Sequence, residues 1–111
     1  MTFVDTNALD VREPREGWRG RFFRSESMGF AWYTVDAGAW IHVHQHPNDE
    51  VWIVVEGELE VTVDGESFVA GPGCAAVVAP DTPHGVTAIT DARAIVVDSP
   101  PRDSIGGVDL T

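Results

Sequence analysis

Residues 38–57 decide the fold, and they read GAWIHVHQHPNDEVWIVVEG. Three histidines, His42, His44 and His46, occupy every second position before a Pro-Asn turn, and Glu50 begins the next apolar run. Successive side chains of a β-strand point to opposite faces, so this spacing predicts that the three imidazoles share one face. Neighbouring antiparallel strands lie about 4.8 Å apart, so Glu50 can reach the same point in space as His46. The stretch therefore predicts two adjacent strands that bring polar side chains to one place.

In the rest of the chain, turn-forming residues recur at the spacing typical of an all-β protein. Gly, Pro and Asp-Gly pairs recur about every 8–12 residues, the spacing of short strands in a sandwich or barrel. The runs between them predict strands over residues 30–35, 40–46, 50–55, 58–63, 67–70, 74–78, 84–89 and 93–97. Asp64-Gly65 predicts a two-residue type I′ hairpin turn. We expect a small all-β barrel over residues 18–103, with a polar arm at 1–17 and a Gly-rich tail at 104–111 that frays.

Size and charge exclude several classes of protein. The chain has 111 residues, enough for one domain, and 7 Lys plus Arg against 18 Asp plus Glu give a net charge of -11. Phosphate backbones and anionic lipids repel such a surface, and no apolar run approaches the roughly 20 residues of a membrane span. The first residues lack the pattern of a secretory signal, so we expect a cytoplasmic protein. Cys74, the only cysteine, is expected to be a buried hydrophobic residue.

The candidate metal ligands are imidazoles and one carboxylate. His84 stands at the start of a later strand, behind the proline-stiffened loop at residues 79–83. Three imidazoles with one carboxylate suit one ion of Fe(II), Mn(II), Ni(II), Cu(II) or Zn(II) per chain, and disfavour Ca and Mg. Four protein ligands leave two neighbouring positions of an octahedron for water or substrate, which makes the ion a Lewis acid.

The spacing of these residues resembles the cupin superfamily. Gly38, His44, His46, Glu50 and Gly57 match the first cupin motif throughout its length, and Gly73 with Pro83-His84 matches the second. The resemblance covers roughly residues 30–101 and is to the small single-domain cupins. It implies a jelly-roll β-barrel (a double-stranded β-helix), a metal site of His44, His46, Glu50 and His84, and a homodimer. Asp81 stands where the family usually has Gly, and Asp tolerates the same left-handed backbone.

The end of the barrel carries a narrower resemblance. Residues 98–103, DSPPRD, are similar to the tail of small cupins that convert unsaturated uronic acids from pectin breakdown to open-chain keto sugars. Those proteins usually carry an aromatic residue where this chain has Asp98, and an acid where it has Val96. The tail therefore supports a subfamily of compact cupins more than it supports a substrate.

Four further side chains are candidates for the site. His42 is not part of the motif, and by alternation it points inward, either as a proton carrier or as a satisfied interior histidine. Trp32, Trp40 and Trp52 either form the core or line a substrate pocket.

These features predict a metal-dependent enzyme acting on a small oxygenated organic molecule. Chelation by the ion would support isomerase, cyclase or lyase chemistry, or a dioxygenase reaction if the ion is iron. The alternatives are a non-catalytic cupin module that binds a metal or small ligand, and a small subunit that docks on a larger enzyme. The fold itself does not decide among them.

Overall fold

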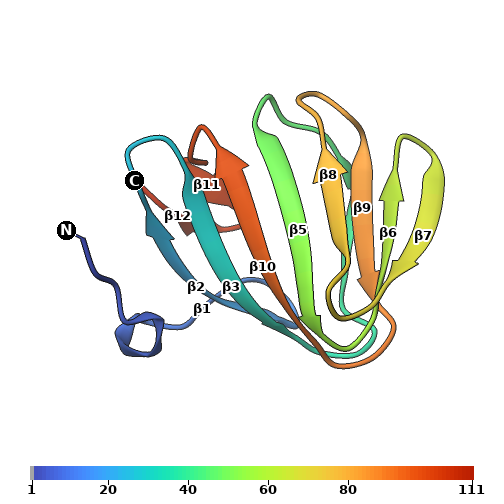
Figure 1. The fold of residues 1–111 in the computed structure, drawn as a ribbon, viewed down its shortest axis with the longest axis horizontal. Coiled ribbons are helices and arrows are strands. Elements are labelled where there is room, and N and C mark those ends of the chain that lie inside the picture. The colour runs from blue at the N-terminus through green and yellow to red at the C-terminus, as the bar shows by residue number, and fades with distance from the viewer. Residues whose placement is uncertain (1) are drawn as a thin grey trace.

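The computed structural model describes residues 2–111, which form two main antiparallel sheets (Figure 1). The first sheet consists of β1 (Arg12–Arg15), β2 (Trp18–Arg24), β3 (Gly29–Val35), β10 (Ala92–Ser99), β5 (Asp49–Glu56) and β8 (Ala75–Val78), in that spatial order. The second consists of β4 (Trp40–His44), β9 (His84–Ala88), β6 (Leu59–Val63) and β7 (Glu66–Ala70). A small hairpin, β11 (Ser104–Ile105) with β12 (Val108–Asp109), follows them, and η1 (Thr6–Ala8) is a single 3-10 turn.

The connections give the two sheets their jelly-roll arrangement. From β3 to β10 the chain passes from one sheet to the other at every connection except the β6–β7 hairpin. Inward-facing side chains alternate with outward-facing ones, as along β10, where Ala92, Ala94 and Val96 are buried. Two facing antiparallel sheets connected in this way form a jelly roll. The predicted all-β jelly-roll barrel is confirmed.

Aromatic side chains fill the space between the sheets. Trp18 packs edge to face against Tyr33 and Trp52, with ring centroids 5.5 and 5.7 Å apart, a favourable geometry for aromatic pairs. All three are buried and come from β2, β3 and β5. They contact a core of smaller side chains from both sheets, chiefly Val35, Ile41, Val54, Leu59, Val61, Val78, Val86, Ala94 and Val96.

All eight strands expected from the sequence are present, with ends that shift by a few residues at most. Asp64 and Gly65 have φ angles of 49° and 83°, which the type I′ turn between β6 and β7 requires. Asp81 also lies in the left-handed region, with φ 58°. Its backbone N–H donates a hydrogen bond of 2.8 Å to the carbonyl of His46, which ties the loop before β9 to the loop after β4.

The two ends of the chain contribute strands that the sequence pattern did not show. Arg12–Arg15 forms β1 at the edge of the six-stranded sheet, although residues 1–17 were expected to be an arm. The tail, expected to fray, forms the β11–β12 hairpin, and Arg12 donates a hydrogen bond to the carbonyl of Asp109. Both termini lie on the β1–β2 side of the barrel (Figure 1). Edge strands carry exposed charged side chains, so they lack the apolar alternation by which strands are recognised.

Two further observations concern the surface. Cys74 is exposed, which corrects the expectation of a buried thiol. It lies in the turn before β8, where its N–H donates to the carbonyl of Gly71, so it precedes the alternating part of the strand. Within residues 2–111, no helix is long and apolar enough to cross a membrane.

Candidate metal centre

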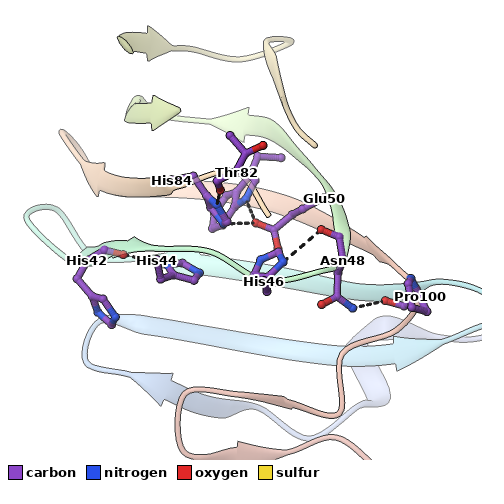
Figure 2. A network of polar contacts seen from close by, with 9 residues as sticks. His42, His44, His46, Asn48, Glu50, Thr82, His84 and Pro100 are labelled. Atoms are coloured by element: carbon purple, nitrogen blue, oxygen red, sulfur yellow. Dashed lines mark hydrogen bonds and ion pairs between the residues drawn. The ribbon is translucent and has the colours of Figure 1, made fainter. Parts of the chain in front are cut away.

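Three imidazoles and one carboxylate converge between the two sheets. His44 ends β4, His84 begins β9, His46 lies in the loop that follows β4, and Glu50 lies in β5 of the opposite sheet. His44 and His84 are partners across the β4–β9 ladder, with ring centroids 4.4 Å apart. Figure 2 shows the rings of His46 and His84 on either side of the Glu50 carboxylate. The topology thus brings together residues that are up to 40 positions apart (44 to 84) in the sequence.

A bulge in β4 separates His42 from the other histidines. Ile41 pairs with Val86 and His44 pairs with His84, so three steps along β4 match two steps along β9. The extra residue turns both Ile41 and His44 inward and leaves His42 exposed. The ring of His42 points away from the Glu50 carboxylate in Figure 2. The inward placement expected for His42 is therefore wrong, because strict alternation ends at the bulge.

Backbone carbonyls fix the orientation of the three remaining imidazoles. His44 Nδ1 donates to the carbonyl of His42 at 2.9 Å, His46 Nδ1 to that of Asn48 at 3.2 Å, and His84 Nδ1 to that of Thr82 at 2.8 Å (Figure 2). A carbonyl oxygen only accepts, so each Nδ1 carries the hydrogen and each neutral ring presents the lone pair of Nε2. A hydrogen bond from the other ring nitrogen to a carbonyl is the usual support of a metal-binding histidine.

The Glu50 carboxylate is buried against two of these rings. Its Oε2 lies 3.1 Å from His46 Nε2 and its Oε1 lies 3.3 Å from His84 Nε2, yet neither nitrogen forms an aligned hydrogen bond. Burial raises the pKa of Glu50, but contacts with His46, His84, Asp98 and Trp52 together outweigh it, so the pKa lies well below its usual range. Burial lowers the pKa of His84, but the Glu50 carboxylate and the Thr82 carbonyl together outweigh this effect, so the pKa is raised. The cluster thus holds an ionised carboxylate that favours positive charge beside it.

These atoms fit a divalent transition metal. The ligand atoms of His44, His46 and His84 all lie within 4.8 Å of one another. Ligand atoms at about 2.1 Å from one ion and at right angles to each other lie about 3 Å apart, close to the separations of Glu50 from His46 and His84. The two buried Nε2 atoms without hydrogen-bond partners are the atoms that such an ion would satisfy. Residues His44, His46, Glu50 and His84 could therefore hold a metal ion.

The three tryptophans expected at a pocket lie in three different places. Trp52 is 4% exposed and belongs to the core, whereas Trp32 is 42% exposed on the outer face of the six-stranded sheet. Trp40 is 63% exposed and lines, together with His42, a surface depression of about 570 Å³. Alternation along a strand does not reveal which face is inside until the sheets are assembled. Only Trp52 contacts the cluster, through its indole N–H on Glu50.

Comparison with known proteins identifies the family. The Cupin domain family model matches residues 31–100. The chain belongs to the cupins. An uncharacterized protein of Streptomyces coelicolor is 33% identical over 92 residues, which cover 82% of this cupin and 88% of that protein.

Two relatives with named functions or structures extend the comparison. The structure of KdgF from a Halomonas species has a TM-score of 0.87 and 29% identity, and the match covers 93% of this chain and 96% of that one. L-ectoine synthase of Mycobacteroides abscessus is 29% identical over 93 residues, or 78% of this chain and 71% of that protein. The predicted cupin family is confirmed.

One buried acid of this cupin was missed as a site residue. Asp98 lies in β10 directly opposite Glu50 in the β10–β5 ladder, and its side chain is buried. In the sequence, Asp98 attracted attention only because the related small cupins usually carry an aromatic residue at that position. Residues 92, 94 and 96 are small and apolar, and Asp98 is the next residue on the same inward face of β10. This alternation with a period of two could have predicted that Asp98 is buried.

A cavity of about 340 Å³ has Asp98, the cross-strand neighbour of Glu50, in its lining. Phe22, Phe30 and Ala31 line it with the arginines Arg12, Arg24 and Arg102. The tail hairpin contributes Ile105 to the wall, so the cavity lies between the six-stranded sheet and the end of the chain. Its size is that of a small-molecule site.

Proposed function

We propose that this cupin is a metal-dependent enzyme that acts on a small oxygenated organic substrate. His44, His46, Glu50 and His84 would hold one divalent ion of Fe, Mn, Ni, Cu or Zn. The observation that carries the proposal is that three imidazoles are anchored by backbone carbonyls at Nδ1, and that the Nε2 atoms of His46 and His84 lie beside the buried Glu50 carboxylate. When bound, such an ion acts as a Lewis acid on an oxygen-bearing group, which suits isomerase, cyclase or lyase chemistry, or a dioxygenase if the ion is iron.

The chain itself contributes orientation and enclosure. The carbonyls of His42, Asn48 and Thr82 hold the imidazoles, and Trp52 holds Glu50. Asn48 is fixed in turn by its side-chain N–H, which donates to the carbonyl of Pro100 at 2.7 Å. Preorganised ligands of this kind keep the site geometry without rearrangement. The neighbouring cavity offers room for a small organic molecule, and L-ectoine synthase among the relatives supports an enzymatic role.

A second candidate function is a non-catalytic cupin module that binds a metal or small ligand. The exposed position of His42 favours it, because the histidine expected to carry a proton points away from the Glu50 carboxylate. In this reading the carbonyl-anchored imidazoles would only retain an ion, and no side chain would need to exchange protons with a substrate.

We also propose that two copies associate through the outer face of the six-stranded sheet. Trp32, Ile95 and Ile53 are successive neighbours across β3, β10 and β5, and Val55 and Val77 extend the apolar surface. The outer face of a solvated antiparallel sheet is ordinarily polar, and a contiguous apolar patch marks an interaction site. A self-complementary patch fits a two-fold dimer. The acidic composition supports neither nucleic acid nor membrane as a partner, and with the lone cysteine it supports a cytoplasmic location.

The decisive experiment is elemental analysis of protein purified without chelator. We expect one equivalent of transition metal per chain in the unsubstituted protein and its loss in His84→Ala. His42→Ala is the matched control, because only the backbone carbonyl of His42 supports His44. Absence of metal from the unsubstituted protein, even after reconstitution, would contradict the proposal.

A second experiment distinguishes an enzyme from a binding module: the protein is incubated with a cell extract, and the metabolites are analysed by mass spectrometry. An enzyme present at a small fraction of the metabolite concentration consumes many equivalents of one compound, and His84→Ala consumes none. A binding module removes at most one equivalent, which is recovered on denaturation.

A further inference from the structure

A metal site of His44, His46, Glu50 and His84 does not explain why a second acid, Asp98, is buried beside Glu50. The two residues face each other across β10 and β5, and each is 3% exposed. Among residues 2–111 no ion pair within 4.0 Å involves Asp98. Burial and the neighbouring Glu50 raise the pKa of Asp98 to about 9, against a smaller opposing effect of Arg102. Two adjacent buried carboxylates are costly unless a cation or proton lies between them or beside them.

One oxygen of Asp98 has no partner at all. The Oδ1 atom is buried and accepts no hydrogen bond, whereas Glu50 has Trp52 and the two imidazoles around it. A buried polar atom left without a partner needs an explanation, and a bound ion is one that also accounts for the neighbouring Glu50. Ligand atoms of His46, Glu50 and Asp98 also lie within 4.8 Å of one another. His46 and Glu50 therefore belong both to the histidine cluster and to a second group that includes Asp98.

The separation of these atoms permits one shared ion. Ligand atoms on opposite sides of an ion lie about 4.2 Å apart when each bond is about 2.1 Å, so small side-chain adjustments would bring the atoms of His46, Glu50 and Asp98, which lie within 4.8 Å of one another, to one centre. His46 also belongs to the group of three histidines, so an ion at that centre would be shared with His44 and His84. We propose that Asp98 is a fifth protein ligand of the metal, which gives a site of three imidazoles and two carboxylates. This inference rests on the proposed metal-dependent function.

A fifth ligand changes what the site can do. Two carboxylates neutralise a divalent ion, so the buried charge of the whole site is balanced. With five protein ligands, one exogenous group could still bind a six-coordinate ion, whereas four protein ligands would allow two. The additional oxygen donor shifts the preference toward the harder ions Fe(II) and Mn(II) and away from Cu. Because Asp98 also lines the cavity of about 340 Å³, the remaining position would be reached from that side.

Cobalt(II) titration of the metal-free protein tests the assignment. We expect Asp98→Asn to bind Co(II) at least about 10-fold more weakly than the unsubstituted protein, with more intense visible bands that mark a lower coordination number. Asp49→Asn removes the charge of an exposed neighbour of Glu50 and should bind Co(II) like the unsubstituted protein. An asparagine amide can still donate a hydrogen bond to Glu50, so a residue that only positioned Glu50 would leave affinity and spectrum unchanged in Asp98→Asn. That unchanged result would overturn the proposal.

A second variant gives a positive signal. If position 98 reaches the ion, the thiolate of Asp98→Cys should produce a sulfur-to-cobalt charge-transfer band, which the unsubstituted protein with its exposed Cys74 lacks. Absence of the band in a folded, cobalt-loaded Asp98→Cys protein would also overturn the fifth ligand. If the unsubstituted protein binds no Co(II), both the proposed function and this inference fail. If it binds Co(II) and both Asp98 variants behave as non-ligands, only the inference fails.

Discussion

The indole N–H of Trp52 donates a hydrogen bond of 2.5 Å to Oε1 of Glu50, within a single strand and on its inward face. Trp52 in turn packs edge to face on Trp18 and parallel to Tyr33, with centroids 5.7 and 6.3 Å apart. The carboxylate of the candidate metal centre is therefore anchored in the aromatic core of the barrel. Because a packed core has little freedom, the Glu50 oxygen atoms have little freedom either.

This anchor predicts the behaviour of Trp52→Phe. Phenylalanine retains much of the aromatic packing but cannot donate to Glu50, so metal affinity should fall by about 10–100-fold, the range typical when a supporting hydrogen bond to a ligand is lost. Competition with a chelator of known affinity measures the change. Trp32→Phe, on the exposed outer face, is the control and should bind metal normally. Equal affinities in the two variants would mean that the indole hydrogen bond does not organise the site.

Tyr33 predicts a loss of stability at alkaline pH. Burial raises the pKa of this tyrosine well above its ordinary value, with a smaller opposing effect of Arg15. The folded protein therefore keeps the phenol neutral, while the unfolded chain ionises near pH 10. The contribution to stability is complete below about pH 10 and decreases above it, by about 1.4 kcal/mol for each further pH unit.

Urea unfolding at several pH values from 8 to 11 measures this dependence. The chain has a single tyrosine and no lysine, so few other groups titrate in this range. Tyr33→Phe should lack the alkaline decrease. Tyrosinate absorption in the native protein at pH 10 would show instead that the phenol is accessible.

The surroundings of Gly57 leave no room for a side chain. Its φ is 75°, and an added Cβ would lie 2.1 Å from the backbone oxygen of Asp91. Gly65→Ala is the matched control, because Gly65 has φ 83° but open space around the same atom. We expect Gly65→Ala to cost about 1–2 kcal/mol of unfolding free energy, from the left-handed backbone alone. Gly57→Ala should cost at least about 2 kcal/mol more, from steric overlap. Equal unfolding free energies would contradict the close approach.

The apolar outer face predicts a dimer that one charge can break. Ile53→Lys places an ammonium group at the centre of the patch, where burial in a dimer would be costly. Sedimentation equilibrium should give twice the chain mass for the unsubstituted protein and about 12.0 kDa for the variant. Val69→Lys, on the exposed side of β7 in the other sheet, should remain dimeric. A monomeric unsubstituted protein would refute the proposed interface.

Local sequence patterns were sufficient for much of the architecture. The eight strands, the Asp64-Gly65 turn and the left-handed Asp81 each depend on a few consecutive residues, because alternation and turn geometry are set by neighbours along the chain. The meeting of His44, His46, Glu50 and His84 followed from motif spacing, since a family resemblance carries long-range information that periodicity lacks.

The remaining features depend on contacts between strands. His42 is exposed because β4 has one residue more than β9 between two ladder pairs, and no property of residues 40–46 alone reveals that register. Asp98 joins the cluster because β10 lies next to β5, far away in sequence. The tryptophans separate for the same reason, since each strand alternates but only the assembled sheets define an inside. The sequence by itself determined which segments become strands and which residues can bind a metal, whereas the tertiary structure decided which side chains face one another, because pairing register is a property of two strands and not of one.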